Sequence, residues 1–176
     1  MSSVVPTWLW SDQHFGHVNI LSYSSRPFRN ITEHDETLIQ NYNAVVKPHD
    51  VVLWIGDAFL ARTPYPQHVM SRLSGYNILI RGNHDGTVSR CREFGFEQVW
   101  DRHEFEGFQC THFPYGTVHK AKHLPVPKRQ HGVTLLHGHT HSVERTSEGA
   151  VHVGVDAWGY RPVHIDEIKA LIGKKQ

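Results

Sequence analysis

Side chains that suit metal ions stand directly behind five short apolar runs of this sequence. The five segments are Asp12-Gln13-His14, Gly56-Asp57, Gly82-Asn83-His84-Asp85, Thr111-His112 and Gly138-His139-Thr140-His141. The apolar runs before them have the length and composition of buried β-strands. Ligands at the carboxyl ends of strands converge in space, because open α/β sheets form their sites in the crevice outside those ends. The sequence therefore predicts a catalytic centre with more than one metal ion.

The spacing within these segments agrees with metal binding. Asp12 and His14 alternate along extended chain, so both side chains can face one ion. Asp57 adds a carboxylate whose two oxygens can each bind a different ion, although a Gly-Asp pair alone is more often only a turn. His139 and His141 are again two apart and can point towards neighbouring ions if the backbone bends at the preceding glycine.

Two further residues complete the candidate ligand set. Asn83 offers a neutral oxygen, and Gly82 before it permits a sharp bend from strand to loop. His112 is an isolated histidine, which taken alone is more often a hydrogen-bonded residue of the core or surface. The joint occurrence of all the segments, in this order and at strand ends, makes the pattern specific.

Composition restricts the other classes of function. Sixteen histidines among 176 residues are dispersed along the chain, which favours a folded site over a terminal tag. The formal charge of +1 gives no general attraction to membranes or to long duplex nucleic acid. Cys91 and Cys110 form no CxxC pair, and no run of about 18 apolar residues occurs. Because residues 1–10 lack a basic segment followed by a long apolar run, we expect no leader segment. We expect a cytoplasmic protein without a membrane partner, in the host cytoplasm if a phage encodes it.

The remaining pattern predicts one α/β domain over residues 1–176, without a cap domain. Helices are expected from a cap at Thr32 to Val46, over 67–73 and over 87–94, the last ended by Gly95. Short strands are expected in the second half, at 98–100, 104–110, 133–136, 150–155 and 163–165. This mixture favours sheet packed on sheet with helices outside.

The stretch 115–132 has little apolar periodicity and carries Lys120, Lys122, Lys128 and Arg129. It is expected to be an exposed basic loop. The alternative is a basic flap that meets a phosphate-bearing substrate.

In order and spacing, the metal-binding segments resemble the calcineurin-like metallophosphoesterase superfamily, from Asp12 to about Pro162. The segments 12–20, 112–114 and 154–158 resemble a compact bacterial and phage branch of predicted phosphoesterases. The resemblance implies a four-layer α-β-β-α sandwich, with two mixed sheets flanked by helices. It also implies two divalent metal ions, Mn with Fe, Zn, Co or Ni as alternatives, because the donors are oxygen and nitrogen without sulfur.

The resemblance further assigns roles to residues. One ion would take Asp12, His14, Asp57 and His141, and the other Asp57, Asn83, His112 and His139. A hydroxide shared by the ions would attack phosphorus, preferably in nucleotide-like or cyclic nucleotide diesters. His84 would protonate the leaving group or stabilise charge on the phosphoryl oxygens, with Asp85 holding its ring.

Substrate contacts are expected from His17, Arg26 and Asn83. His17 equally suits a hydrogen bond to a ligand residue. Arg26 and Arg29 suit a phosphate or, alternatively, are solvated surface charges. The partner would be a small phosphate ester or nucleotide. Alternative functions are a phosphomonoesterase, an inactive binding module with a retained metal site, and a structural metal protein with a closed ion.

Overall fold

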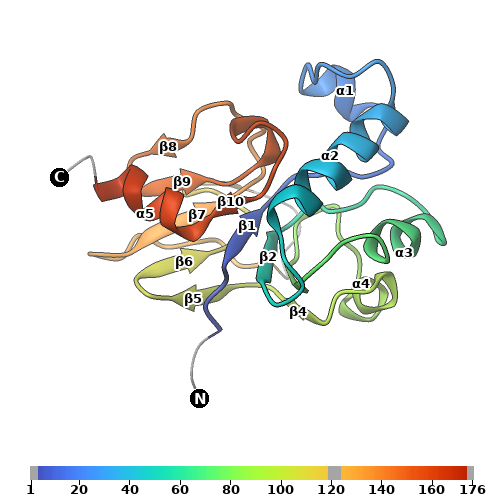
Figure 1. Ribbon diagram of the computed structural model, residues 1–176. Coiled ribbons are helices and arrows are strands. Elements are labelled where there is room, and N and C mark those ends of the chain that lie inside the picture. Colours follow the sequence, from blue (N-terminus) through green and yellow to red (C-terminus); the bar gives the residue numbers. More distant parts are fainter. Residues whose placement is uncertain (1–3, 119–123, 174–176) are drawn as a thin grey trace.

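Two five-stranded sheets lie face to face in the computed structural model, which describes residues 4–118 and 124–173 (Figure 1). The first sheet has the order β10-β1-β2-β3-β4. Its strands are β1 (Trp8–Trp10), β2 (Val51–Ile55), β3 (Tyr76–Ile80), β4 (Gln98–Trp100) and β10 (Val163–His164). Strands β1 to β4 are parallel, and β10 is antiparallel to β1. The carboxyl ends of β1, β2 and β3 therefore lie at one edge.

The second sheet has the order β5-β6-β7-β9-β8. Its strands are β5 (His103–Phe105), β6 (Phe108–Cys110), β7 (Thr134–His137), β8 (Thr146–Ser147) and β9 (Ala150–His152). The central strands β6, β7 and β9 are parallel, and the outer strands β5 and β8 are antiparallel to their neighbours. Both sheets are thus mixed.

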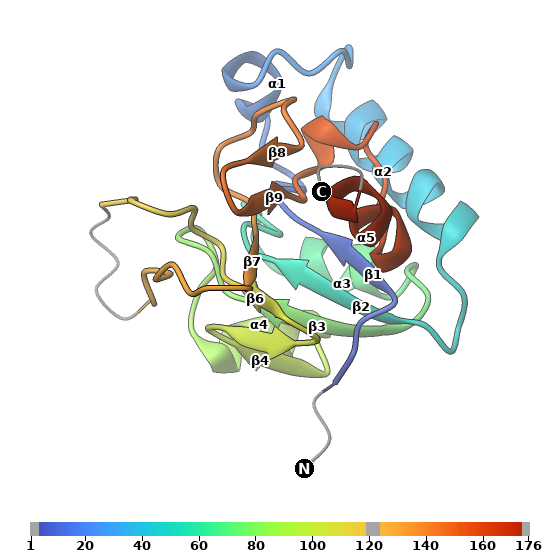
Figure 2. The ribbon, with the colours of Figure 1, turned by 90° about the vertical axis from the view of Figure 1, so that its left-hand side faces the viewer.

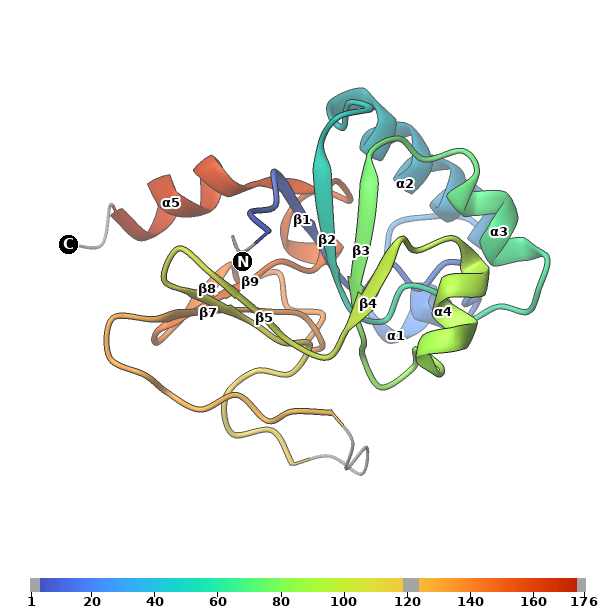
Figure 3. The same cartoon turned by 90° about the horizontal axis from the view of Figure 1, so that it is seen from below.

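Three helices cover the first sheet on the side away from the second, as Figure 3 shows, namely α2 (Ile31–Val45), α3 (Tyr65–Met70) and α4 (Val88–Phe94). The described residues also form α1 (Ile20–Tyr23), α5 (Ile165–Gly173) and a 3₁₀ turn at Val155–Ala157. One core cluster joins α2, α3 and α4 to this sheet, and in it Trp10, Trp54 and Tyr42 are fully buried. The apolar faces of these helices therefore fix the outer layer.

A second core cluster fills the space between the sheets. Leu9, Leu53 and Ile78 of the first sheet pack there with buried side chains of β6, β7 and β9. Helix α5 lies next to β1 (Figure 2) and contributes Ile165 and Ile168 to this same cluster. The expected α/β domain with two mixed sheets and helices is confirmed, whereas the four-layer arrangement stays part of the resemblance.

Several boundaries differ from the predicted ones for local reasons. Helix α2 is capped by Asn30, whose side chain accepts from Glu33 N at 2.9 Å, so the predicted cap at Thr32 was wrong by two residues. Gly95 ends α4 with φ 120°, as predicted. The single strand expected over 104–110 is two strands, because Glu106 and Gly107 turn the chain with positive φ.

The expected basic loop lies partly outside the described residues, since Lys120 and Lys122 belong to 119–123. Its described parts, 115–118 and 124–132, contain neither helix nor strand. Arg129 in this loop lies over the ring of Tyr115 at 4.5 Å and pairs with Glu148 at 3.6 Å. No helix within 4–118 and 124–173 has both the length and the apolar character needed to span a membrane.

Candidate metal centre

The predicted ligands lie at the carboxyl ends of five strands from both sheets. Asp12 and His14 follow β1, Asp57 follows β2, Asn83 follows β3, His112 follows β6, and His139 and His141 follow β7. Six of them form two groups that can each hold a metal ion, in which the ligand atoms lie within 4.8 Å of one another. The groups are Asp12, His14 and His141, and Asp57, His112 and His139. Asn83 is exposed in the loop after β3.

Asp57 is the residue that connects the two groups. Its Oδ2 lies 3.6 Å from His14 Nε2 in the first group and 3.3 Å from His112 Nε2 in the second. The other oxygen, Oδ1, accepts a hydrogen bond from His84 N at 2.9 Å. The carboxylate is therefore fixed between the groups, with one oxygen facing a ring nitrogen of each.

Two of the ring nitrogens in the centre are buried without a hydrogen-bond partner among the described residues, namely His14 Nε2 and His112 Nε2. The other ring nitrogen of His112, Nδ1, contacts the carbonyl oxygen of Ile55 at 2.9 Å. A hydrogen bond of this kind leaves Nε2 as the metal-binding atom. An unsatisfied buried polar atom such as His14 Nε2 costs about 1 to 3 kcal/mol, and a bound cation would remove that cost. The residues therefore fit a metal ion.

The electrostatics agree with ionised carboxylates and mostly neutral imidazoles. Burial raises the pKa of Asp12, but the contact with His152 and the charges of His112 and His141 outweigh it and hold this pKa far below its usual value. Burial lowers the pKa of His14 to about 3 and also lowers that of His139. At neutral pH these are the protonation states that bind metal ions.

His112 is the exception in the metal-free centre. Burial lowers its pKa, but the charge of Asp57 and the contact between the two side chains outweigh burial and raise it to about 9. The same contact lowers the pKa of Asp57 despite its burial. The proton on His112 thus occupies the place that a cation would take beside Asp57.

The backbone around the centre is bent in an unusual way. Left-handed φ values between 51° and 73° occur at Asp12, His14, Asp57, His139 and His141. Residues with side chains rarely adopt this conformation, which costs about 1 to 3 kcal/mol each. The bends turn neighbouring side chains of a loop towards one point. The sequence analysis expected extended backbone at Asp12 and His14 and did not predict these bends.

Glycines allow the close approach of neighbouring loops. A Cβ atom on Gly138 would overlap Ser11 Oγ and the carboxylate of Asp12, and one on Gly82 would overlap the carboxylate of Asp57. A Cβ atom on Gly56 would likewise overlap the ring of His112. Each glycine is thus needed for the ligand positions.

His84 lies at the open side of the centre. Its side chain is 42% exposed, and Nε2 is 3.9 Å from Asp57 Oδ2. Its ring centroid is 5.4 Å from that of His14 and 6.5 Å from that of His17. His84 is therefore placed to meet a ligand that enters from solvent.

Asp85 has a role different from the expected one, which was to hold the ring of His84. Its carboxylate accepts hydrogen bonds from the backbone N–H groups of Gly82 at 2.7 Å, Asp57 at 2.8 Å and Ala58 at 3.1 Å. Burial and the charge of Asp57 raise the pKa of Asp85 to about 6. Asp85 therefore joins the loops after β2 and β3 and positions the backbone of Asp57.

Arg26 also differs from the expectation, because it is neither a phosphate anchor nor a surface charge. Its side chain is fully buried, and Nε and Nη2 each donate to the carboxylate of Asp156 at 2.8 Å. Nη2 and Nη1 also donate to the carbonyl oxygens of Asp12 at 2.7 Å and Gln13 at 3.0 Å. The guanidinium therefore fixes the loop after β1. Arg29 is a surface charge, 85% exposed beside Glu33.

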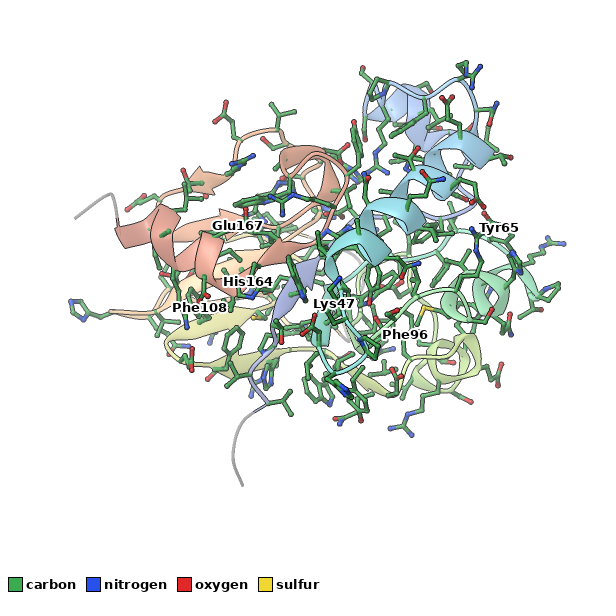
Figure 4. All side chains as sticks on the ribbon, viewed as in Figure 1. Lys47, Tyr65, Phe96, Phe108, His164 and Glu167 are labelled. Carbon is green, nitrogen blue, oxygen red and sulfur yellow. The ribbon has the colours of Figure 1, made fainter. Side chains whose placement is uncertain are left out.

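A buried polar network extends from Arg26 into α2. His34 contacts Arg26 through Nε2 at 2.9 Å and Asp35 through Nδ1 at 2.6 Å. Asp35 also accepts from Gly16 N at 2.9 Å and from the hydroxyl of Tyr65 at 2.5 Å, with Tyr65 labelled on α3 in Figure 4. The network ties the metal-binding loop to two helices.

Three supporting residues were missed by the sequence analysis. Asp156 Oδ2 contacts His141 Nδ1 at 3.3 Å, and His152 Nε2 lies 3.8 Å from Asp12 Oδ2. His34 acts through Arg26. Asp156 and His152 contact residues of other loops, and His34 contacts Arg26 eight positions before it, outside the metal-binding segments, so the motif pattern did not indicate them. His17 was predicted, and its Nδ1 lies 3.3 Å from His14 Nδ1, while its contact with substrate stays a prediction.

Comparisons with known proteins give relatives along nearly the whole chain, although no model of a known protein family matches it. An uncharacterized protein of Methanocaldococcus jannaschii is 29% identical over 180 residues, covering 95% of this chain and 91% of that protein. The gene 66 protein of Mycobacterium phage L5 is 32% identical over 195 residues, covering 94% of this chain and 93% of that protein.

The fold also has a solved counterpart. The crystal structure of a protein of unknown function from Aquifex aeolicus matches with a TM-score of 0.69 at 22% identity, and covers 93% of this chain and 97% of that one. At this identity the match shows a shared fold. By its similarity over nearly the full length of both proteins, the chain belongs to the family of the gene 66 protein of Mycobacterium phage L5.

Proposed function

We propose that this protein is a dinuclear metal-dependent phosphoesterase that prefers phosphodiesters. The observation that carries the proposal is the carboxylate of Asp57, which lies within 3.6 Å of His14 Nε2 and 3.3 Å of His112 Nε2, between two groups that can each hold an ion. The resemblance of the ligand segments to calcineurin-like metallophosphoesterases, with their four-layer sandwich, agrees with it.

The donor set supports two divalent ions. The oxygen and nitrogen donors, with no sulfur, suit Mn, with Fe, Zn, Co and Ni as alternatives. Two such ions held by these residues would supply an activated water near neutral pH and would bind the oxygens of a phosphoryl group. Asn83 would complete the second group from the loop after β3.

His84 is the candidate general acid. It is the exposed imidazole beside Asp57, and it lies at the mouth of the centre. A protonated ring there would donate to the departing ester oxygen, as general acids do when within hydrogen-bond reach. The hydrogen bond from its backbone N–H to Asp57 Oδ1 fixes the backbone of His84 beside the ligands.

Turnover by metal-depleted protein resupplied with single ions tests the proposal. The wild type with Mn should hydrolyse bis(p-nitrophenyl) phosphate faster than p-nitrophenyl phosphate, and Asp57→Ala should lose both bound Mn and hydrolysis. His84→Ala should keep its metal and lose about 10²- to 10⁴-fold in rate. His49→Ala, which removes an exposed histidine on the loop before β2, is the matched control.

The alternatives give different results. A faster reaction with the monoester would indicate a phosphomonoesterase. Mn binding by the wild type without hydrolysis of either ester would indicate a binding module. Full hydrolysis by metal-free Asp57→Ala would contradict the proposed chemistry.

A further inference from the structure

Two cavities border His84, and they share His84 and Leu60. One has a volume of ≈ 260 Å³ and is lined also by Arg62 and Arg90. The other has a volume of ≈ 370 Å³ and is lined also by Tyr23 and by metal-centre histidines. Cavities for whole drug-sized ligands range from about 300 to 1,000 Å³, so the first cavity lies below this range and the second near its lower end, and each suits one part of a larger substrate.

The first cavity presents two cations that lack a neutralising partner. Arg62 and Arg90 are exposed and make no ion pair within residues 4–118 and 124–173. Most other arginines of these residues do, namely Arg26, Arg29, Arg72, Arg81, Arg129 and Arg161. The acid that lines this cavity, Asp85, binds backbone N–H groups with both oxygens.

The position of the two arginines suits an anionic group of the substrate. Arg90 lies over the ring of Phe94, with Cζ 5.3 Å from the centroid, which limits its orientations. Guanidinium groups bind phosphate through paired charge-assisted hydrogen bonds. The reacting phosphate itself would lie at the metal centre, so an anion between these arginines is a second one.

The second cavity has an aromatic wall. Tyr23 on α1 is 74% exposed, and its ring stands edge-on to that of His17 at a centroid distance of 6.0 Å. Ile20 and Leu60 add apolar surface, and His14 and His141 connect the cavity to the metal centre. An exposed aromatic face beside a phosphate site suits stacking of a nucleobase, worth about 1 to 3 kcal/mol.

From the two cavities we infer that the substrate is a short linear nucleotide chain. A base next to the scissile phosphate lies against Tyr23, and an adjoining phosphate lies between Arg62 and Arg90. The inference rests on the function proposed above and narrows it, because a cyclic nucleotide has one phosphate and leaves the arginine cavity empty. The chain's net charge of +1 favours a short single strand as substrate rather than a long duplex.

The test compares thymidylyl-thymidine with the same dinucleotide carrying a 5′ or a 3′ terminal phosphate. In the Mn-loaded wild type, the 5′ or the 3′ terminal phosphate should raise kcat/KM about tenfold over that for thymidylyl-thymidine, mainly through a lower KM. The Arg62→Ala/Arg90→Ala protein should lose this preference. Arg92→Ala removes an arginine of α4 that lies outside the cavity and has no ion-pair partner among the described residues, and this variant should keep the preference for a terminal phosphate.

Tyr23→Ala tests the aromatic wall. It should lower the ratio of kcat/KM for thymidine 5′-(p-nitrophenyl phosphate) to that for methyl p-nitrophenyl phosphate by about tenfold. The control is Tyr76→Ala, which removes a tyrosine that is 40% exposed on β3.

Calorimetry supplies a readout independent of turnover. Thymidine 3′,5′-bisphosphate should bind the wild type and Arg92→Ala about tenfold more tightly than thymidine 5′-monophosphate does, and the double variant should not distinguish the two. Hydrolysis of bis(p-nitrophenyl) phosphate without any preference for terminal phosphate would overturn the inference and leave the proposed function standing. A wild type that hydrolyses no phosphate ester would overturn both.

Discussion

Replacing Arg26 by methionine is expected to destabilise the metal-free fold far more than loss of a surface arginine. The guanidinium is fully buried and makes two 2.8 Å hydrogen bonds to Asp156, whose side chain is only 4% exposed. Methionine keeps much of the apolar stem but leaves the carboxylate without its cation. Breaking one partner of a buried ion pair costs about 3 to 5 kcal/mol.

This loss is a large part of the total stability of a domain, which is about 5 to 15 kcal/mol. For a chain of this size it corresponds to a fall in Tm of roughly 6 to 20 °C. Urea unfolding of metal-free protein at pH 7, followed by tryptophan fluorescence, measures the free energy of unfolding. Arg29→Met is the matched control, because its pair with Glu33 is exposed and screened by solvent, so its loss should change the free energy of unfolding little.

A second substitution tests the reason for the loss. Asp156→Asn removes the charge that Arg26→Met leaves uncompensated, so the double variant should lose at least about 1 kcal/mol less than the sum of the single losses. A loss in Arg26→Met no greater than in Arg29→Met, or strict additivity in the double variant, would refute the assigned role of the pair.

Two further predictions concern the metal centre. Gly82→Ala places a Cβ against the carboxylate of Asp57 and should lower Mn affinity at least tenfold by equilibrium dialysis, whereas Gly173→Ala, with open space around it, should not. His112 has a folded pKa of about 9 against an ordinary value of 6.5, so the stability that its proton gives the metal-free protein is present below pH 6.5 and lost as the pH rises to about 9. The slope over this range should approach about 1.4 kcal/mol per pH unit and disappear in His112→Gln, and an unchanged slope in that variant would contradict the role of His112.

The positions of the ligand loops were predictable from the sequence because each depends on a local pattern. An apolar run followed at once by a polar segment indicates a strand end, and parallel strands end at one edge of a sheet. Asp12 and Asp57 were therefore expected near one another although 45 positions separate them in the sequence. Asp57 and His112 follow strands of different sheets, and only the resemblance implied that they bind the same ion. The left-handed φ of Asp57 could not be read from its type, because only tertiary contacts support that conformation.

The roles of Arg26 and Asp85 could not be predicted because their partners lie elsewhere in the chain. Arg26 binds Asp156, 130 positions away, and an arginine beside a proline reads as a surface charge until that contact is known. Asp85 follows His84 directly, but its oxygens face backbone N–H groups of the loop after β2.

Helix α5 was missed although its signal is present. Ile165, Ile168, Leu171 and Ile172 recur at helical spacing, but the segment 163–165 was assigned to a strand and the pattern after it was not followed. The strand is confirmed at Val163–His164, and the helix begins at the very next residue. A backbone that changes from strand to helix without a loop offers no turn residue as a boundary.

Anomalous X-ray scattering from crystals grown with Mn tests the central claim most directly. Two peaks about 3.5 to 4 Å apart are expected, with the carboxylate of Asp57 bound to both. One ion should also contact Asp12, His14 and His141, and the other His112 and His139. A single peak, or two peaks without Asp57 between them, would contradict the account.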